Sequence, residues 1–277
     1  MSAAFNQWLS YSRRVLSADL PHLPTTAQRC ALRSILMLYG QAVEVRQPER
    51  LAGIPDPAIF AFNHNNSVES VVVPCAMIFH RSGRRIHFMI DWMYLRIPLI
   101  GWIMRQVDPI PVFTKPARWR LWEGYRQAHR HLSPVDLCCQ YLEDGKSVGI
   151  FPEGTRNRSA TTLLKGRLGL GQLVLRSQQP VIPVGIDFPA KQRLGRIPTV
   201  GRMVVSIGEA LHFTAERQAF RELHENQGGS AEQHARELGR EVVSGVMRAL
   251  GPLCSKQYPY HNDRPAPRAP ERTREVL

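Results

Sequence analysis

Short apolar runs rich in β-branched residues alternate with longer segments of helical periodicity through most of this chain, and this alternation constrains the fold most strongly. The predicted strands are residues 58–63, 85–91, 108–113, 147–151, 181–187 and 203–207. The predicted helices between them are residues 68–81, 92–105, 117–132, 134–144 and 166–177. Strands separated by helices are typical of an α/β fold, so we expect a mixed, mostly parallel sheet flanked by helices.

The ends of the chain differ from this central part. Residues 1–50 are predicted to form an N-terminal helical segment, because residues 27–45 carry an apolar face at helical spacing with arginines beside it. This segment could pack on the core or lie at a membrane interface, and the pattern leaves both interpretations open. The main domain is expected at residues 51–255, with its last helix at 230–250. Residues 256–277, rich in proline and charge, are predicted to be a disordered tail.

The charge balance points to an anionic partner. Lys and Arg number 36 against 23 Asp and Glu, which gives a net charge of +13. Such an excess suits nucleic acid, an acidic membrane surface or a phosphorylated substrate. The chain has no zinc-ribbon pairing and no aromatic RNA-binding signature, so we expect no nucleic-acid partner.

Two further observations concern the cellular setting. No secretory signal and no apolar stretch of about 20 residues is present, so we expect no helix that crosses a bilayer.

The five cysteines are odd in number and irregular in spacing, which favours a reducing compartment over a disulfide framework. The adjacent Cys138 and Cys139 lie in an apolar helical pattern, and simple packing is their expected role.

The stretch FNHNNSVES, residues 62–70, places a histidine at the predicted end of a strand. Ligands of parallel α/β sheets usually bind at that edge. His64 can meet Glu69, five residues later, only if His64 lies in the turn and Glu69 in the first turn of the next helix. The same residues also predict a capping box, in which the side chain of Glu69 accepts a hydrogen bond from the backbone N–H of Asn66 at the N-cap. The stretch alone does not decide between these roles of Glu69.

A second stretch, SVGIFPEGTRNRS, residues 147–159, runs from an apolar strand into a dense polar turn. Gly154 permits close approach of the backbone, and Arg156 offers a planar fork that suits a phosphate. Further basic residues follow at Arg158, Lys165 and Arg167. A strand that ends in such a turn is typical of an anion-binding site, although solvated basic loops are also common.

Together these stretches resemble the glycerolipid acyltransferase family, the group that includes 1-acylglycerol-3-phosphate acyltransferases. The blocks that carry the resemblance are NHNNSVE (63–69), GWIMRQVDPIPV (101–112), FPEGTRNRS (151–159), LLKGRLG (163–169) and VIPVGI (181–186). They cover roughly residues 55–210, and the FPEGTRNRS block is the most specific. One departure is that the family usually has Asp where this chain has Glu69.

The resemblance implies transfer of a fatty acyl group from acyl-CoA or acyl-carrier protein to the hydroxyl of a lysophospholipid. His64 would be the general base and Glu69 its partner. The residues implied in substrate binding are Arg105, Glu153, Gly154, Thr155, Arg156 and Lys165. No cofactor beyond the acyl donor is implied. We also expect no metal, because no cluster supplies three or four ligands.

Alternatives to this function remain open from sequence. The acceptor could be another lysolipid or an amino-acid lipid, and the chain could instead be a membrane-binding protein without catalysis. Because acceptor and product are lipids, we expect a peripheral protein on an anionic membrane surface at the cytoplasmic face. The segment 94–104, with Trp102 and several aliphatic residues, could enter that surface or pack in the core. The acyl-transfer interpretation requires His64 and Arg156 to share one pocket.

Overall fold

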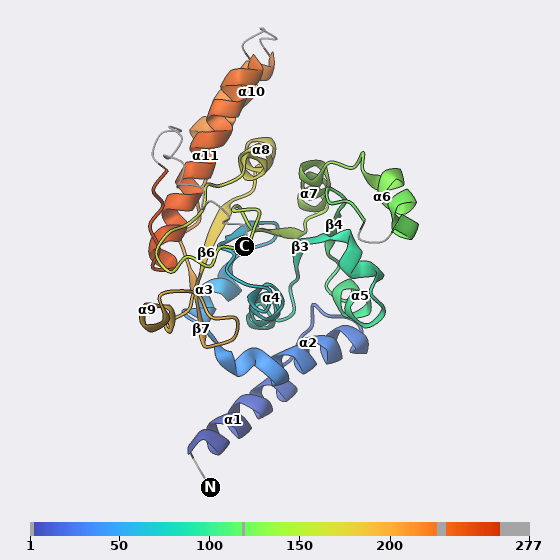
Figure 1. Cartoon of the computed structure of the whole chain (residues 1–277), viewed down its shortest axis with the longest axis vertical. Helices are drawn as coiled ribbons and strands as arrows, with labels where there is room; N and C mark the ends of the chain where they lie inside the picture. The colour runs from blue at the N-terminus through green and yellow to red at the C-terminus, as the bar shows by residue number, and fades with distance from the viewer. Residues whose placement is uncertain (1–2, 118–119, 226–230, 261–277) are drawn as a thin grey trace, which may run out of the picture.

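Seven strands form one sheet in the computed structural model, which describes residues 3–117, 120–225 and 231–260 (Figure 1). The strands are β1 (Val43–Val45), β2 (Ile59–Phe62), β3 (Ile86–Asp91), β4 (Ile110–Val112), β5 (Ser147–Ile150), β6 (Val181–Asp187) and β7 (Met203–Ile207). Their order is β1-β7-β6-β2-β5-β3-β4, and only the β6–β7 pair is antiparallel. The predicted α/β class with a mixed, mostly parallel sheet is therefore confirmed.

The central strand β2 shows how the sequence builds two apolar layers. All four of its residues are buried, and successive side chains point to opposite faces of the sheet. Ile59 and Ala61 belong to one core cluster, whereas Phe60 and Phe62 belong to the other. A strand covered on both faces has no polar side, which explains its continuous apolar run.

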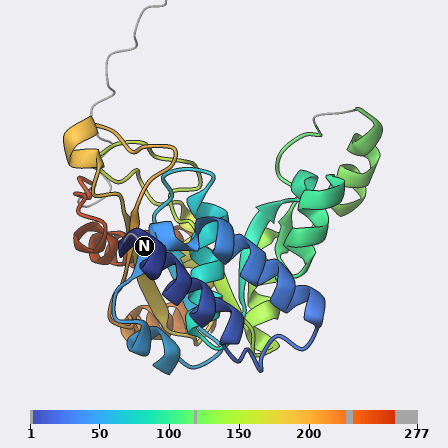
Figure 2. The same cartoon turned by 90° about the horizontal axis from the view of Figure 1, so that it is seen from below.

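Helices cover both faces of the sheet. The helices are α1 (Ala3–Ser17), α2 (Thr26–Tyr39), α3 (Pro48–Gly53), α4 (Glu69–His80), α5 (Pro98–Arg105), α6 (Glu123–His129), α7 (Pro134–Glu143), α8 (Leu168–Arg176), α9 (Lys191–Leu194), α10 (Thr214–Glu225) and α11 (Ala231–Leu253). Residues of α7, α8 and α11 pack on the Ile59 face, and residues of α3 and α4 pack on the Phe60 face. The outer side of α4 packs against α1 and α2, which Figure 2 shows in blue across the near side of the molecule.

The N-terminal segment is not helical to its end. Helix α2 begins at a capping box between Thr25 and Gln28 and ends at Gly40, where an added Cβ would meet the Tyr11 hydroxyl at 1.9 Å. After a short 3-10 turn the chain forms β1, which pairs with β7, so residues 43–45 belong to the sheet. Helix is predicted from sequence at these positions because the apolar helical spacing continues to Val45. The β-branched side chains of Val43 and Val45 favour a strand instead.

Two predicted helices are interrupted. The one expected at 92–105 divides into a 3-10 helix, Trp92–Arg96, and α5, because Pro98 keeps Ile97 in an extended conformation. In the part of 117–132 that the structure describes, a 3-10 turn at Arg120–Trp122 precedes the short α6.

The C-terminal boundary also differs from the prediction. Residues 254–260, here called the C-terminal strap, follow α11 and run back along the domain, and Lys256 and Tyr258 in it are buried. Gln257 pairs with the 161–163 segment through backbone hydrogen bonds. The predicted tail therefore starts too early, and residues 261–277 lie outside the described residues.

The cysteines behave as packing residues. Cys75, Cys138, Cys139 and Cys254 are buried, and Cys30 is exposed. Burial raises the pKa of the Cys75, Cys138 and Cys254 thiols to about 12, so these groups are protonated and unreactive near neutral pH.

We predict that Gly171→Ala destabilises the domain by about 1–3 kcal/mol, because the added methyl group would overpack a close helix–helix contact. A Cβ at Gly171 of α8 would lie 2.1 Å from the backbone oxygen of Gly239 on α11. Urea unfolding followed by circular dichroism measures the change in free energy.

Gly169→Ala is the matched control on the same helix. A Cβ there would meet only Val135, at an ordinary contact distance of 3.8 Å. We expect no loss, or a gain of up to about 1 kcal/mol from the better helix propensity of alanine. Equal stability of the two variants would contradict the close packing of α8 on α11.

Candidate active site

Three parallel strands end next to one another and bring the predicted motifs together. β2 pairs with β5 on one side and β6 on the other, with Phe62 opposite Val184. The FNHNNSVES stretch follows β2, and the FPEGTRNRS turn follows β5. Because the three strands run in the same direction, these segments meet at the carboxyl edge of the sheet, where ligands of α/β proteins bind.

His64 and Glu69 are in direct contact. The Nδ1 atom of His64 lies 3.1 Å from Oε1 of Glu69, and the exposed fractions of the two side chains are 17% and 0%. A carboxylate can only accept, so the proton of the neutral imidazole belongs on Nδ1 and Nε2 keeps its lone pair. The ring packs against Phe151, with 4.5 Å between the ring centroids.

The same carboxylate also exchanges hydrogen bonds with Asn66 in the pattern of a capping box, in the turn that leads into α4. The backbone N–H of Asn66 donates to Glu69 Oε1 at 3.0 Å, and Asn66 Oδ1 accepts from the backbone N–H of Glu69 at 3.0 Å. Asn65 adds its backbone N–H to Oε1 and its side-chain amide to Oε2, the latter at 2.9 Å. The two roles that the sequence left open for Glu69 therefore occur together, because one oxygen caps the turn and also holds the histidine.

The asparagines around His64 tie the turn to the sheet. The Asn63 side chain bonds both the N–H and the carbonyl of Ile186, at 2.6 and 2.9 Å, and so joins the ends of β2 and β6. The Asn65 amide donates to the same carbonyl at 3.2 Å, and the Asn66 amide donates to the carbonyl of Pro198 at 3.1 Å. All three asparagines are buried, so their amides act as structural ties.

Glu153 joins the second motif to the first. Its side chain is 1% exposed. Oε1 accepts from the backbone N–H of His64 at 3.1 Å, and Oε2 accepts from the Asn157 amide at 2.7 Å and the Leu164 N–H at 2.8 Å. A carboxylate whose oxygens are occupied by protein donors is suited to holding the loop. Direct contact with an acceptor, which the resemblance implied for Glu153, does not follow from this geometry.

Arg156 reaches the turn that carries His64. Its Nη1 atom donates to the hydroxyl of Ser67 at 2.6 Å, and the backbone N–H of Asn157 donates to the carbonyl of His64 at 2.7 Å. The Arg156 side chain is exposed, which leaves part of its guanidinium accessible. The imidazole and the guanidinium thus come from segments about ninety residues apart and lie on one edge of the sheet.

The remaining predicted residues lie at different distances from this centre. Gly154 has a φ of +65°, and a Cβ there would lie 3.0 Å from the Arg167 side chain, so glycine is required. Thr155 and Lys165 are exposed on the same loop. Arg105, at the end of α5, donates to the carbonyl of Leu95 at 2.7 Å, and this bond lies outside the group formed by the two motifs.

Lys256 is a member of the site that the sequence analysis missed. Its ammonium group is buried and donates to Oδ1 of Asn65 at 2.6 Å. The residue fell within the predicted tail, where no pattern marked it. Tyr258 and Tyr260 were an available signal, because aromatic residues are unusual in disordered segments.

The described part of the chain lacks a cluster of metal ligands and a helix that could span a membrane. In residues 3–117, 120–225 and 231–260, no three His, Cys, Asp or Glu side chains are grouped so as to hold a metal ion. The expectation that the protein uses no metal stays a prediction. Within the same ranges, no helix has the length and apolar character needed to cross a membrane.

A model of the acyltransferase family matches residues 42–187, more than half of the chain. The chain therefore belongs to the acyltransferase family, and it is an O-acyltransferase. The matched residues contain both motifs and the strands β2, β5 and β6 that bring them together.

Among the proteins similar to this chain are a curated relative and a solved structure. The relative is a 1-acyl-sn-glycerol-3-phosphate acyltransferase of Bacillus subtilis, 24% identical over 182 residues, or 66% of this chain and 79% of that protein. The solved structure is the 1-acyl-sn-glycerophosphate acyltransferase PlsC of Thermotoga maritima. It has a TM-score of 0.47 and 17% sequence identity, covering 89% of this chain and 82% of that one.

Replacement of Glu153 tests its role as a tie between the motifs. In Glu153→Gln an amide NH₂ would replace one oxygen and face protein donors. We expect a loss of about 1–3 kcal/mol in the free energy of unfolding for each buried donor left without an acceptor, measured by urea denaturation.

Glu241→Gln, at an exposed position of α11, is the control and should change stability by less than about 0.5 kcal/mol. If Glu153→Gln were as stable as this control, the carboxylate would not be holding the loop.

Proposed function

We propose that the enzyme transfers a fatty acyl group from an acyl thioester to the hydroxyl of a lysophospholipid, most simply 1-acylglycerol-3-phosphate. The observation that carries the proposal is the contact between the two motifs. His64 is bonded to the buried Glu69, and Arg156 is bonded to Ser67 on the same turn. The name of the Bacillus subtilis relative supports the choice of acceptor.

His64 is proposed as the general base. With Nδ1–H held by Glu69, the lone pair on Nε2 takes the proton of the acceptor hydroxyl as its oxygen attacks the thioester carbonyl. The tetrahedral intermediate collapses to the ester, and the leaving thiolate takes the proton back from the imidazolium. The negative charge of Glu69 stabilises that imidazolium, as a carboxylate does in a Ser-His-Asp triad, but here the substrate supplies the nucleophile.

The phosphate of the acceptor is assigned to Arg156. A guanidinium binds a phosphate through two parallel hydrogen bonds, and the exposed Lys165 and Arg167 add positive potential around it. Lys165 and Thr155 follow Arg156 as proposed substrate contacts. The acyl donor is proposed to be acyl-CoA or acyl-carrier protein.

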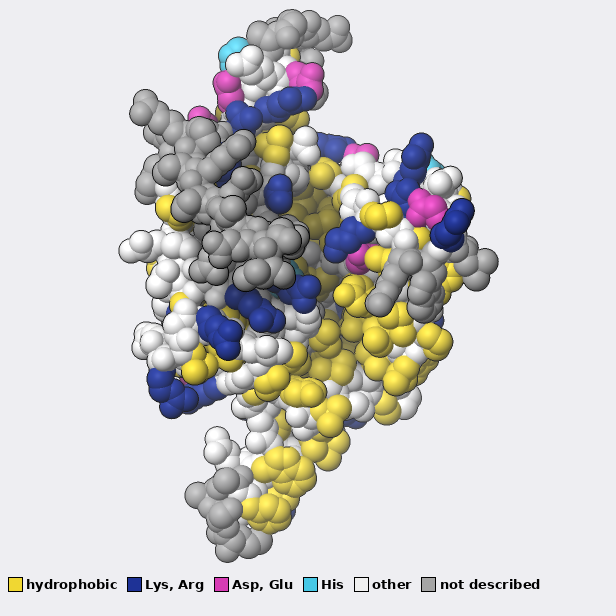
Figure 3. All heavy atoms as spheres, viewed as in Figure 1, with side chains coloured by type: hydrophobic (Ala, Val, Ile, Leu, Met, Phe, Trp, Pro, Cys, Tyr) yellow, Lys and Arg dark blue, Asp and Glu magenta, His cyan; other side chains and the backbone are white. Residues whose placement is uncertain are grey.

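A membrane surface is the proposed place of the reaction. Large apolar side chains are exposed on α1, at the end of α2 and on α5 and the turn before it. They are Phe5, Trp8, Leu16, Leu38, Tyr39, Tyr94, Ile97, Leu99, Ile100 and Trp102. Figure 3 shows a broad hydrophobic face over α5 that continues toward α1, with Lys and Arg side chains gathered beside it. An apolar face next to positive charge suits peripheral binding to anionic lipid, which we propose occurs at the cytoplasmic face.

The first test is His64→Ala. Loss of the base should reduce kcat per folded enzyme by about 10²–10⁴-fold, and loss of one donor to the buried Glu69 should lower the free energy of unfolding by about 1–3 kcal/mol without abolishing the fold. Release of free thiol from acyl-CoA in the presence of lysophosphatidic acid measures the rate. Turnover at the wild-type rate in folded His64→Ala would contradict the proposed mechanism, and no thiol release by the wild type with any lysolipid would contradict the proposed reaction.

The second test compares Arg156→Ala with Arg158→Ala. Loss of a phosphate contact should raise the KM for 1-acylglycerol-3-phosphate by about 10-fold or more for Arg156→Ala. Arg158→Ala, two residues along the same basic loop, should stay within about twofold of wild type. If Arg156→Ala lowered turnover equally for lysolipids with and without a phosphate, the assignment of Arg156 would be wrong.

The third test concerns membrane binding. Leu99 of α5 is 70% exposed, and Leu99→Glu places a charge in the proposed lipid-facing surface. We expect weaker sedimentation with anionic vesicles, by about fivefold or more, because a buried leucine side chain contributes about 1.5–3 kcal/mol. Val200→Glu is the control, since Val200 is 61% exposed in the loop between α9 and β7. Equal loss in both variants would contradict a specific role of α5.

A further inference from the structure

Lys256 is buried beside the candidate active site although it lies 191 residues after its partner Asn65 in sequence. Its exposed fraction is 5%, and its Nζ donates to Asn65 Oδ1 at 2.6 Å. Burial lowers the pKa of this ammonium group, and so does the positive charge of Lys191, while the carboxylates of Glu153 and Glu69 act in the opposite direction. Burying a lysine head group is costly, so a specific role is expected.

The C-terminal strap is fixed on both sides of Lys256. On one side, the buried Lys191 donates to the carbonyls of Cys254 and Ser255, at 2.6 and 3.1 Å. On the other side, Gln257 donates its N–H to Thr161 and accepts from the N–H of Leu163. These bonds hold the backbone on both sides of Lys256, so the direction of its side chain is set by the fold.

The bond to Lys256 is the shortest of the contacts that set which way the Asn65 amide faces. Asn63 Nδ2 also donates to Asn65 Oδ1, at 3.3 Å, and the Asn65 amide donates to the carbonyl of Ile186, at 3.2 Å. An ammonium group can only donate, so the oxygen of the amide must face Lys256. The NH₂ end then faces Oε2 of Glu69, to which it donates at 2.9 Å. The reversed amide would place its NH₂ against the ammonium group and its oxygen against the carboxylate, and both contacts would be repulsive.

We propose that Lys256 is a positioning residue for acyl transfer, which acts through Asn65 to hold the carboxylate of Glu69 against His64. The active site is then completed by the C-terminal strap, a part of the chain outside the residues matched by the family model. This inference rests on the proposed role of His64 as the base. The inference adds Lys256, a residue outside both sequence motifs, to the residues that the reaction requires.

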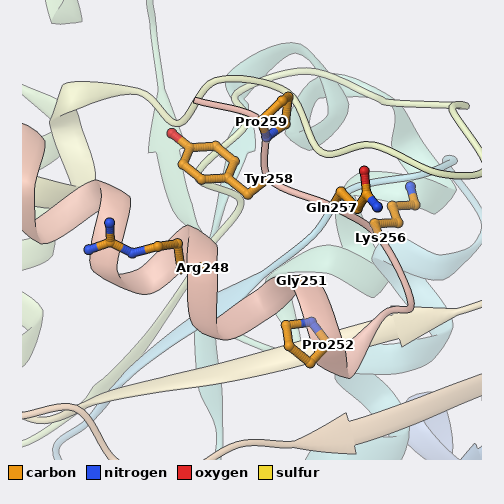
Figure 4. A pocket seen from close by; sticks show the side chains of 7 residues that line it. All are labelled: Arg248, Gly251, Pro252, Lys256, Gln257, Tyr258 and Pro259. Carbon is orange, nitrogen blue, oxygen red and sulfur yellow. The ribbon is translucent and has the colours of Figure 1, made fainter. Parts of the chain in front are cut away.

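The surroundings of Lys256 allow a conservative replacement to be tested. Its side chain lines a cavity of about 330 Å³ between the end of α11 and the strap, with Arg248, Gly251, Pro252, Gln257, Tyr258 and Pro259. Figure 4 shows the Lys256 side chain extending away from Arg248 and Tyr258, which lie at the other side of this cavity. Lys256→Arg keeps both the positive charge and the hydrogen-bond donors, so it is the conservative replacement at this position.

The test compares the kcat and KM of Lys256→Met, Lys256→Arg and Asn65→Ala per folded enzyme, in the thiol-release assay. Lys256→Met keeps the aliphatic stem and removes the donor, so we expect kcat to fall by about 10- to 100-fold with KM nearly unchanged, as for a misplaced catalytic group. Lys256→Arg should lie between this variant and wild type. Arg248→Met, which removes an exposed cation from the same cavity, should keep wild-type kcat.

A double-mutant cycle shows whether Lys256 acts through Asn65. The double variant Asn65→Ala, Lys256→Met should be no slower than Asn65→Ala alone, since the route from the lysine to Glu69 is already broken. Losses that multiply, or an unchanged kcat in Lys256→Met, would overturn the proposal. If Lys256→Met does not fold, the same cycle is built with Lys256→Ala, which also removes the donor, and an unchanged kcat in that variant or losses that multiply would be the contrary result.

His64→Ala in the same series separates this inference from the proposed function. An active His64→Ala would remove the proposed mechanism itself. An inactive His64→Ala together with a fully active Lys256→Met would overturn only the role of the lysine.

Discussion

A carboxylate with no exposed surface, Glu69, is the constraint on which the rest of the site depends. An ionised group can be buried at this depth only if its oxygens are matched by donors. Here the donors are the imidazole of His64, two backbone N–H groups and the amide of Asn65. To supply them, the chain must turn sharply after β2, and this turn places His64 at the edge of the sheet with one nitrogen already engaged.

The sheet makes that turn possible because its parallel strands end together. Asn63 bonds to Ile186 at the end of β6, and Glu153, after β5, accepts from the backbone of His64. Each tie comes from a different strand, so the position of the histidine relative to the basic loop is determined by the register of the sheet. The proposed active site is therefore held by buried polar bonds, while the large apolar cores keep the three strands in place.

Sequence predicted best those parts of the protein that depend on local patterns. The six predicted strands are all present, because continuous apolar runs between turn residues leave few alternatives. The spacing permitted both the contact of His64 with Glu69 and the reciprocal bonds between Asn66 and Glu69, and the family resemblance implied Glu69 as the partner of His64. The features that sequence missed depend on partners far along the chain. Strand β1 forms only beside β7, and Glu153 takes its role from donors at residues 64 and 164. Lys256 meets Asn65 only in the folded structure. No local pattern encodes such contacts.

The tautomer of His64 tests the central claim most directly. Nitrogen-15 NMR of histidine-labelled protein at pH 8.5, above the ordinary titration range of imidazole, distinguishes a protonated ring nitrogen from a bare one. The signals of His64 are assigned by their loss in His64→Gln. A carboxylate acceptor at Nδ1 predicts a proton on Nδ1 and a bare Nε2. A proton on Nε2 with a bare Nδ1 would contradict the account, because Glu69 would then not be holding the ring and no base would face the substrate.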